Sequence, residues 1–128
     1  MKREEISTTK APAAIGPYSQ AVATDQMLYT AGQIPLKPDT GELVGEGIEE
    51  QTRQVLKNLK EVLFAGGADF DSVVKTTIFL TDLGQFAVVN GIYKEFFGKT
   101  KPARSTIQVS ALPKGAQVEI EAVALVKG

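Results

Sequence analysis

Five segments of the chain have the apolar, β-branched or alternating character of strands, and two have apolar residues at helical spacing. Alternation is typical of a half-buried strand, whereas apolar residues three and four positions apart form one face of a helix. The pattern predicts strands at Tyr18–Ala23, Met27–Ile34, Val73–Leu80, Ala103–Val109 and Val118–Val126. It predicts helices at Ile48–Ala65 and Leu83–Phe97. The predicted order of elements is therefore β-β-α-β-α-β-β.

The last predicted strand indicates how the sheet is covered. One of its faces would carry only small or branched apolar residues, namely Val118, Ile120, Ala122, Ala124 and Val126. The opposite face would carry Glu119, Glu121, Val123 and Leu125. Two helices cannot cover both faces of about five strands, so we expect an α+β fold with a single mixed sheet and both helices on one face. Because the other face also carries apolar residues, we expect a second subunit to bury part of it in a small cyclic homo-oligomer.

Composition narrows the possible chemistry. A chain of 128 residues and 13.7 kDa fits a single domain over residues 1–128. Its 14 basic and 15 acidic residues argue against a general nucleic-acid binder. The sequence has no cysteine and no histidine, which excludes a thiolate nucleophile, a Ser-His-Asp triad and a structural zinc site. No apolar run approaches the ~20 residues of a membrane span, and no secretory signal is visible, so the expected location is the cytoplasm.

Charged residues on the predicted strands are the first candidates for a site. Arg104 opens a strand, where its guanidinium can bind a carboxylate through two parallel hydrogen bonds, although many arginines of this kind are ordinary surface groups. Thr106 shares its face of the strand. Glu119 and Glu121 project from one face of the last strand, where carboxylates can position water or move protons. The alternative for this pair is a set of exposed acids on an edge strand.

Three other positions have both a structural and a functional interpretation. Gly32 lies inside a predicted strand, where glycine permits a ligand or another backbone to approach, or marks a β-bulge. Tyr18 follows Gly16-Pro17 and either covers a ligand or is a half-buried strand tyrosine. Asn90 lies on the aromatic side of the second predicted helix, where we expect its amide to brace a neighbouring loop.

Four segments together resemble the YjgF/RidA family of reactive-intermediate deaminases. They are Ala14–Ala21, Thr30–Pro35, Pro102–Thr106 and the stretch from Leu112-Pro113 through Val118–Ala122. The resemblance implies a chorismate-mutase-like fold and a homotrimer whose sheets form a central barrel, with sites in the clefts between subunits. It also implies hydrolysis of small 2-imino acids, such as 2-iminobutanoate and 2-iminopropanoate, to 2-keto acids and ammonia. It implies no cofactor and no metal.

The resemblance also implies roles for individual residues. Arg104 would hold the substrate carboxylate, and Glu119 would orient the attacking water or relay a proton. Tyr18 would cover the ligand from the adjacent subunit, and Asn90 would brace the cleft.

Two of the implied positions depart from the family pattern. Ala31 stands where the family's deaminases often have serine, and it would contact the ligand through the Ala31–Gly32 backbone. Thr106 stands where they often have cysteine, and it would lie near the ligand beside Arg104. We therefore expect activity with an altered rate or substrate preference.

Two other functions are compatible with the same residues. The first is a regulatory or interaction module that binds small carboxylates between subunits without turnover. The second is the translation-inhibitor or endoribonuclease activity that has been attached to the family, which the near-neutral charge and missing histidine disfavour.

Overall fold

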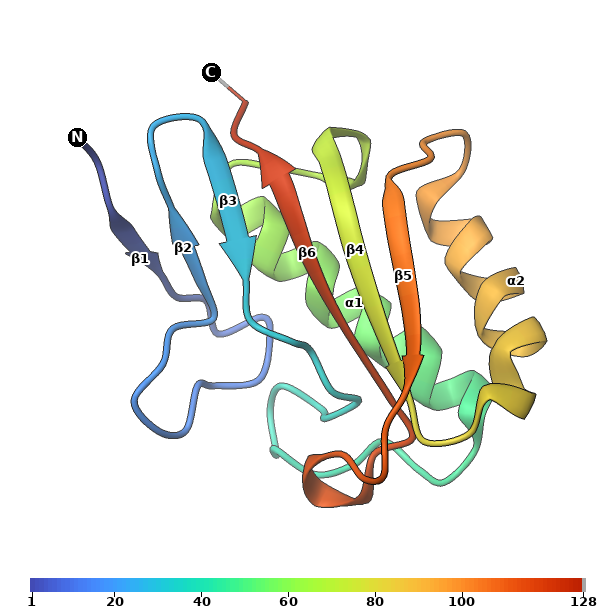
Figure 1. Cartoon of the computed structure of the whole chain (residues 1–128). Helices are drawn as coiled ribbons and strands as arrows, with labels where there is room; N and C mark the ends of the chain where they lie inside the picture. The colour runs from blue at the N-terminus through green and yellow to red at the C-terminus, as the bar shows by residue number, and fades with distance from the viewer. Residues whose placement is uncertain (128) are drawn as a thin grey trace.

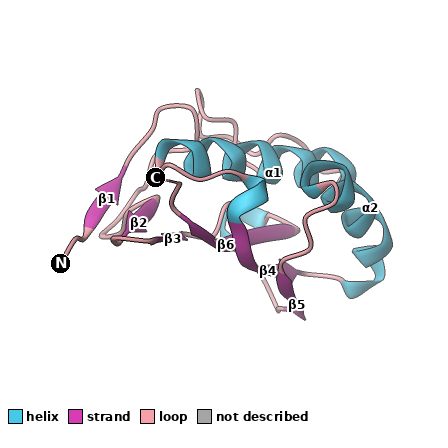
Figure 2. Ribbon diagram, turned by 90° about the horizontal axis from the view of Figure 1, so that it is seen from above, coloured by secondary structure: helices cyan, strands magenta, loops and turns pink. Residues whose placement is uncertain are grey.

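The computed structural model describes residues 1–127 and has an α+β fold, as predicted. The six strands are β1 (Glu4–Ile6), β2 (Ala21–Ala23), β3 (Met27–Thr30), β4 (Val73–Leu80), β5 (Ala103–Gln108) and β6 (Val118–Leu125). The two helices, α1 (Ile48–Ala65) and α2 (Phe86–Phe97), both lie on one face of the sheet (Figures 1 and 2). No helix within residues 1–127 has the length and apolar character needed to cross a membrane.

The sheet is mixed, with strand order β1-β2-β3-β6-β4-β5. All neighbouring strands are antiparallel except β4 and β5, which are parallel and connected through α2. The last strand, β6, lies in the interior of the sheet, whereas β5 lies at an edge (Figure 1). Strand β6 therefore has a neighbouring strand on both flanks, whereas β5 has one open flank.

Helix α1 has the bounds that the sequence predicts. Glu50 accepts a hydrogen bond from the Gly47 backbone N–H at 3.0 Å, which satisfies a free donor at the first turn. Helix α2 begins at Phe86 rather than at the predicted Leu83. Leu83–Gln85 forms a separate 3₁₀ turn, because Asp82 caps it by accepting from the Gly84 N–H at 2.8 Å.

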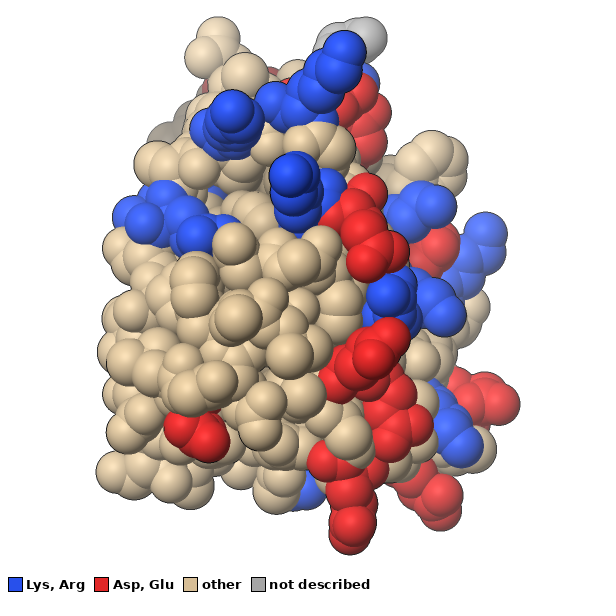
Figure 3. Space-filling model, turned by 90° about the vertical axis from the view of Figure 1, so that its right-hand side faces the viewer, with Lys and Arg blue, Asp and Glu red and all other residues tan. Residues whose placement is uncertain are grey.

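The faces predicted for the last strand are confirmed. Val118, Ile120, Ala122 and Ala124 are buried under the helices. The opposite face has no helix over it, and Tyr29, Ile107 and Leu125 on this open face are 48%, 44% and 46% exposed. In Figure 3 the charged side chains gather over the helices, and few lie toward the open face of the sheet. This open face has the mixed character of a surface that a second chain can cover.

The first third of the chain differs from the prediction. Strand β1 was not predicted, because three residues that include two glutamates give no apolar alternation. The strand predicted from Tyr18 begins only at Ala21. The preceding Gln20 turns its side chain toward loop backbone instead, where Nε2 donates to the Thr8 carbonyl at 3.1 Å and to the Pro12 carbonyl at 2.7 Å.

Strand β3 ends at Thr30 rather than at the predicted Ile34. Tyr29 pairs with Val123 and Gln33 forms a bridge with Ile120, so the β3 side has one more residue than the β6 side. The Thr30 hydroxyl fills the gap in the ladder by accepting from the Ala122 N–H at 3.0 Å. The structure therefore supports a bulge before Gln33, and the bulge directs the chain around the side chain of Glu119.

Candidate functional site

Four of the predicted site residues line one cavity. This cavity has a volume of about 560 Å³, and we call it the Glu119 cavity. Its lining residues are Ala13, Ile15, Tyr18, Ala31, Gly32, Ile34, Leu36, Pro113, Lys114 and Glu119. Apart from Glu119 and Lys114 the wall is mostly apolar, which is the usual make-up of a small-molecule site.

Gly32 and Glu119 are in direct contact. A Cβ atom at position 32 would overlap with the Glu119 carboxylate. Glycine is therefore needed here for space, not for an unusual backbone angle. Of the two interpretations of Gly32, the structure supports the β-bulge, and the group that packs against Gly32 within one chain is the Glu119 side chain rather than another backbone.

Glu119 lies in an environment that favours its protonated form. Burial raises the pKa of the Glu119 carboxyl above its ordinary value, and the negative charge of Glu121 raises it further. A carboxylate with a raised pKa takes up a proton more readily than one in water, which suits a general base. Glu121 lies two residues further along the same face, as the alternation predicts, and it does not line the Glu119 cavity.

Tyr18 lies at the rim of the Glu119 cavity and is 55% exposed. Its backbone N–H donates to the Gly16 carbonyl at 2.9 Å, and Gly16 has a φ of +123° that disfavours any side chain. Lys114 shares this rim and has a left-handed φ of 59°, and it was not predicted as a site residue. In the sequence, only its place between Pro113 and Gly115, which favours a turn, sets Lys114 apart.

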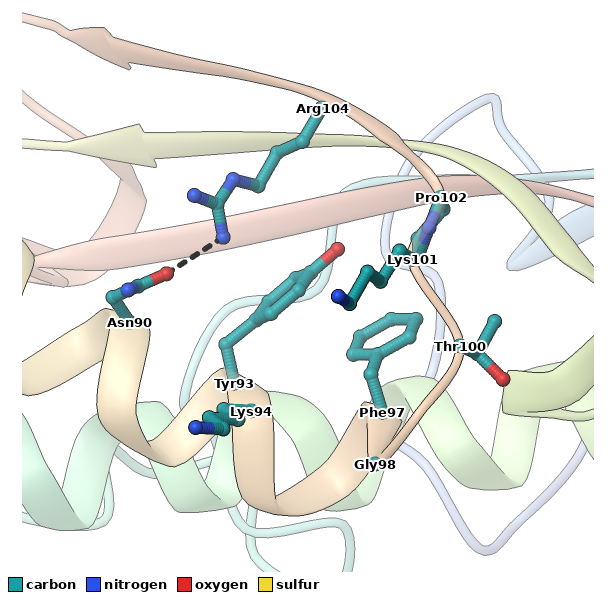
Figure 4. Close-up of a pocket in the computed structure, with 9 residues that line it drawn as sticks. All are labelled: Asn90, Tyr93, Lys94, Phe97, Gly98, Thr100, Lys101, Pro102 and Arg104. Carbon is teal, nitrogen blue, oxygen red and sulfur yellow. Dashed lines mark hydrogen bonds between the residues drawn. The ribbon is translucent and has the colours of Figure 1, made fainter.

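A second cavity contains Arg104, and we call it the Arg104 cavity. It has a volume of about 530 Å³ and lies between α2 and the chain leading into β5 (Figure 4). The Arg104 Nη1 donates to the Asn90 Oδ1 at 2.8 Å. The guanidinium carbon lies 4.9 Å from the ring centroid of Tyr93 and 5.2 Å from that of Phe86. These contacts hold the guanidinium in one place, because cations are attracted to aromatic faces.

Tyr93 is fixed in turn by the core. Its hydroxyl lies 2.8 Å from the Thr76 Oγ1, and its ring stacks on Phe97 with centroids 4.2 Å apart. Burial raises the pKa of the Tyr93 hydroxyl, so this group stays neutral at physiological pH. Phe86 and Tyr93 belong to the aromatic side of the helix on which the sequence analysis placed Asn90, and their spacing puts all three on one helical face.

The two cavities lie on opposite faces of the sheet. Arg104 pairs with Thr76 in the β4–β5 ladder, and Thr76 is buried against Tyr93 of α2. Glu119 alternates with the buried Val118 and Ile120, so it points to the open face. Thr106, half-buried, follows Arg104 on the helix-facing side of β5. One chain therefore brings Tyr18, Ala31, Gly32 and Glu119 together, and it keeps them apart from Arg104, Asn90 and Thr106.

Across residues 1–127 no group of three or more Asp and Glu side chains is placed to hold a metal ion.

The α+β fold agrees with the comparisons to known proteins. The family model described as Endoribonuclease L-PSP matches residues 8–126. The chain therefore belongs to the YjgF/RidA family, and the resemblance of its four segments is confirmed.

Curated relatives cover almost the whole chain. A protein of Mus musculus named 2-iminobutanoate/2-iminopropanoate deaminase is 56% identical over 96% of this chain and 91% of its own length. The protein of Homo sapiens with the same name is 54% identical over 96% of this chain and 90% of its own length. A protein of Arabidopsis thaliana named Reactive Intermediate Deaminase A, chloroplastic, is 54% identical over 97% of this chain and 66% of its own.

Solved structures show the same fold. A protein of the conserved Rid family from Yersinia pestis has a TM-score of 0.95 and 56% identity, covering 98% of this chain and 100% of that one. The structure of E. coli TdcF with bound serine has a TM-score of 0.92 and 42% identity, covering 97% of this chain and 99% of that one.

Proposed function

We propose that this protein hydrolyses small 2-imino acids, such as 2-iminobutanoate and 2-iminopropanoate, to 2-keto acids and ammonia. The observation that carries the proposal is the half-buried Glu119 carboxylate, whose pKa is raised and which faces a largely apolar cavity of suitable size. The names of the mouse and human relatives support it, because they share more than half of their residues with this chain over nearly its full length.

The complete site is proposed to form between two chains. Arg104 on the edge strand β5 of one copy would approach the Glu119 cavity of its neighbour, since the sheet separates the two residues within one chain. A homotrimer whose open sheet faces form a central barrel would also cover Tyr29, Ile107 and Leu125. Closed rings of identical subunits are the common solution for such a surface.

The proposed reaction begins with a protonated imine whose carboxylate is held by Arg104. Water forms a bond to C2, the C=N electron pair moves to nitrogen, and Glu119 accepts the proton that the water loses. Glu119 then returns this proton to the amino nitrogen of the carbinolamine. The C–N bond breaks with its electron pair on the departing ammonia, and the hydroxyl oxygen forms the new C=O bond as its proton passes to the Glu119 carboxylate, which releases it to water. Positioning of this kind lowers barriers by several kcal/mol.

The remaining predicted residues would shape this inter-chain site. Tyr18 would cover the ligand from the chain that supplies Glu119, and the Ala31–Gly32 backbone would contact it closely. Asn90 would hold the Arg104 guanidinium for carboxylate binding, and Thr106 would face the ligand from the same strand. The solved structure of E. coli TdcF has serine bound, and serine is an amino acid with the same carboxylate group, which supports this class of ligand.

We further propose that the protein acts in the cytoplasm and needs no cofactor, metal, nucleic acid or membrane. The name of the Arabidopsis relative places that protein in the chloroplast, so the compartment varies among relatives.

A coupled assay tests the proposed function. Threonine dehydratase and threonine supply 2-iminobutanoate, whose decay is followed with and without this protein. Faster decay is the expected result, and Arg104→Ala should abolish most of the acceleration. Unchanged decay together with calorimetric binding of 2-ketobutanoate would instead identify a carboxylate-binding module. Cleavage of an RNA substrate without imine hydrolysis would favour the endoribonuclease activity for which the family model is named.

A further inference from the structure

Two buried amide side chains on α1 contact the backbone around the Glu119 cavity. Gln51 and Asn58 lie seven residues apart on the core side of the helix and are 0% and 1% exposed. Buried amides need hydrogen-bond partners, because an unpaired polar group in the core is destabilising. Their partners therefore indicate what these residues hold in place.

Asn58 holds one wall of the cavity. Its Nδ2 donates to the Leu36 carbonyl at 2.9 Å and to the Ile34 carbonyl at 3.2 Å. Its Oδ1 accepts from the Gln54 Nε2 at 2.9 Å, which fixes the orientation of the amide. Ile34 and Leu36 both line the Glu119 cavity. Asn58 therefore sets the position of this wall relative to α1.

Gln51 holds the start of the strand that carries Glu119. Its Oε1 accepts from the Gln117 backbone N–H at 2.9 Å, and its Nε2 donates to the Gly45 carbonyl at 2.7 Å. Gln117 lies two residues before Glu119, and its own carbonyl accepts from the Thr81 N–H at 3.1 Å. The strand is thus fixed to α1 just before the reactive carboxylate.

We propose that Gln51 and Asn58 are positioning residues that set the distance between the Ile34–Leu36 wall and the Glu119 carboxylate. The Ile34–Leu36 wall and the start of β6 are attached to the same rigid helix about two turns apart. Their separation therefore does not depend on the loops that connect them. The inference rests on the proposed function, because its consequence is the placement of the carboxylate against bound substrate.

The test compares variants of the full chain. Asn58→Leu and Gln51→Leu fill the two sites with an apolar side chain and remove the hydrogen bonds, and we expect kcat for 2-iminobutanoate to fall by about 10- to 100-fold, as for an ångström-scale misplacement. The Kd for 2-ketobutanoate should change less than about threefold, because the Arg104 cavity lies on the other face of the sheet. Gln51→Glu retains an acceptor for the Gln117 N–H and should restore part of the rate.

A matched control separates positioning from loss of stability. Val55→Ala removes core packing from the same helix, and Val55 makes no side-chain hydrogen bond to either wall. It should lower the Tm and leave kcat unchanged at a temperature well below the transition. Parental kcat in both leucine variants, or an equal loss in Val55→Ala, would overturn the inference.

Failure of the proposed function has a different signature. If the parent protein does not accelerate imine hydrolysis, the proposed function is wrong, and amide hydrogen exchange then tests the positioning. Exchange at the Gln33 and Val44 amides, which donate to Ile120 and Pro35, should be at least tenfold faster in Asn58→Leu than in Val55→Ala. Equal exchange in the two variants would contradict the inference.

Discussion

The Glu119 cavity disfavours the charge of its carboxylate, whereas the Arg104 cavity stabilises the charge of its guanidinium. Glu119 lies on an interior strand, where burial and a neighbouring carboxylate disfavour its charge. Arg104 lies on an edge strand, where an amide oxygen and two aromatic rings hold its charge. The first arrangement makes a group that exchanges protons, and the second makes a fixed cation. Under the proposed function, proton transfer and carboxylate binding would therefore lie on different faces of one chain, and a second chain would bring them together.

The largest expected effect is the loss of the proton acceptor. Glu119→Gln keeps the size of the side chain and removes its basicity, so we expect kcat to fall by about 10²- to 10⁴-fold. Binding of 2-ketobutanoate should change by less than about threefold, since Arg104 is intact. Steady-state kinetics and calorimetry measure the two quantities. A kcat within about twofold of the parent value would exclude Glu119 as the base.

Arg104→Lys tests the fixed cation. Lysine keeps the charge but loses the planar fork and its stacking on Tyr93 and Phe86, so KM for the imine and Kd for the keto acid should rise about 10- to 100-fold. The fall in kcat should be smaller than for Glu119→Gln. If instead kcat fell and Kd stayed constant, the assignment of carboxylate binding to Arg104 would be contradicted.

Gly32→Ala tests the close packing in the Glu119 cavity. The added Cβ displaces the Glu119 carboxylate, and we expect kcat/KM to fall by about tenfold or more. Gly91→Ala is the matched control, because the exposed Gly91 lies mid-helix in α2 and an added Cβ would meet no atom within 4 Å beyond its own stretch of helix. This control should gain about 0.4–1 kcal/mol of stability by thermal unfolding and retain full activity. Equal kinetics in the two variants would show that the carboxylate has room to move.

The smallest effects are those of pH. Because the folded-state pKa of Glu119 is raised, the folded chain binds a proton more tightly than the unfolded chain. Glu119 therefore makes the free energy of unfolding fall as pH rises from the ordinary glutamate pKa through the raised one. Glu119→Gln should remove this slope and be more stable than the parent at neutral pH, as measured by urea unfolding.

The parental kcat should fall as pH drops through the raised pKa, since the base must be ionised. A less stable glutamine variant would contradict this assignment.

The sequence pattern predicted those elements whose bounds and faces depend on residues close to one another in the chain. The bounds of α1 follow from an apolar stripe with acids at its start and glycines at its end, and the two faces of β6 follow from alternation. The end of β3 was not predictable, because it depends on the Thr30 hydroxyl replacing a carbonyl in the ladder with a strand 92 residues away. Strand β1 is too short and too charged to give a pattern.

The same contrast between local and long-range causes holds for the candidate site. The sequence pattern identified candidate residues of both cavities, and the resemblance supplied their proposed roles. Neither the pattern nor the resemblance indicated that Arg104 and Glu119 project from opposite faces of the sheet. Alternation shows which residues share a face within one strand. The face of Arg104 relative to Glu119 depends on the register between strands, in which Arg104 pairs with Thr76. The aromatic support of Arg104 and the amides of α1 also depend on tertiary contacts.

The most direct test of two half-sites in different chains is complementation. Arg104→Ala and Glu119→Gln chains, each nearly inactive alone, are produced together from one cell with separable affinity tags, and mixed oligomers are purified. In a purified mixed trimer of the proposed kind, about one of the three inter-chain sites receives Arg104 from one chain and Glu119 from its neighbour, so we predict recovery of roughly a third of parental imine hydrolysis. Mixed oligomers no more active than either variant alone would contradict the account.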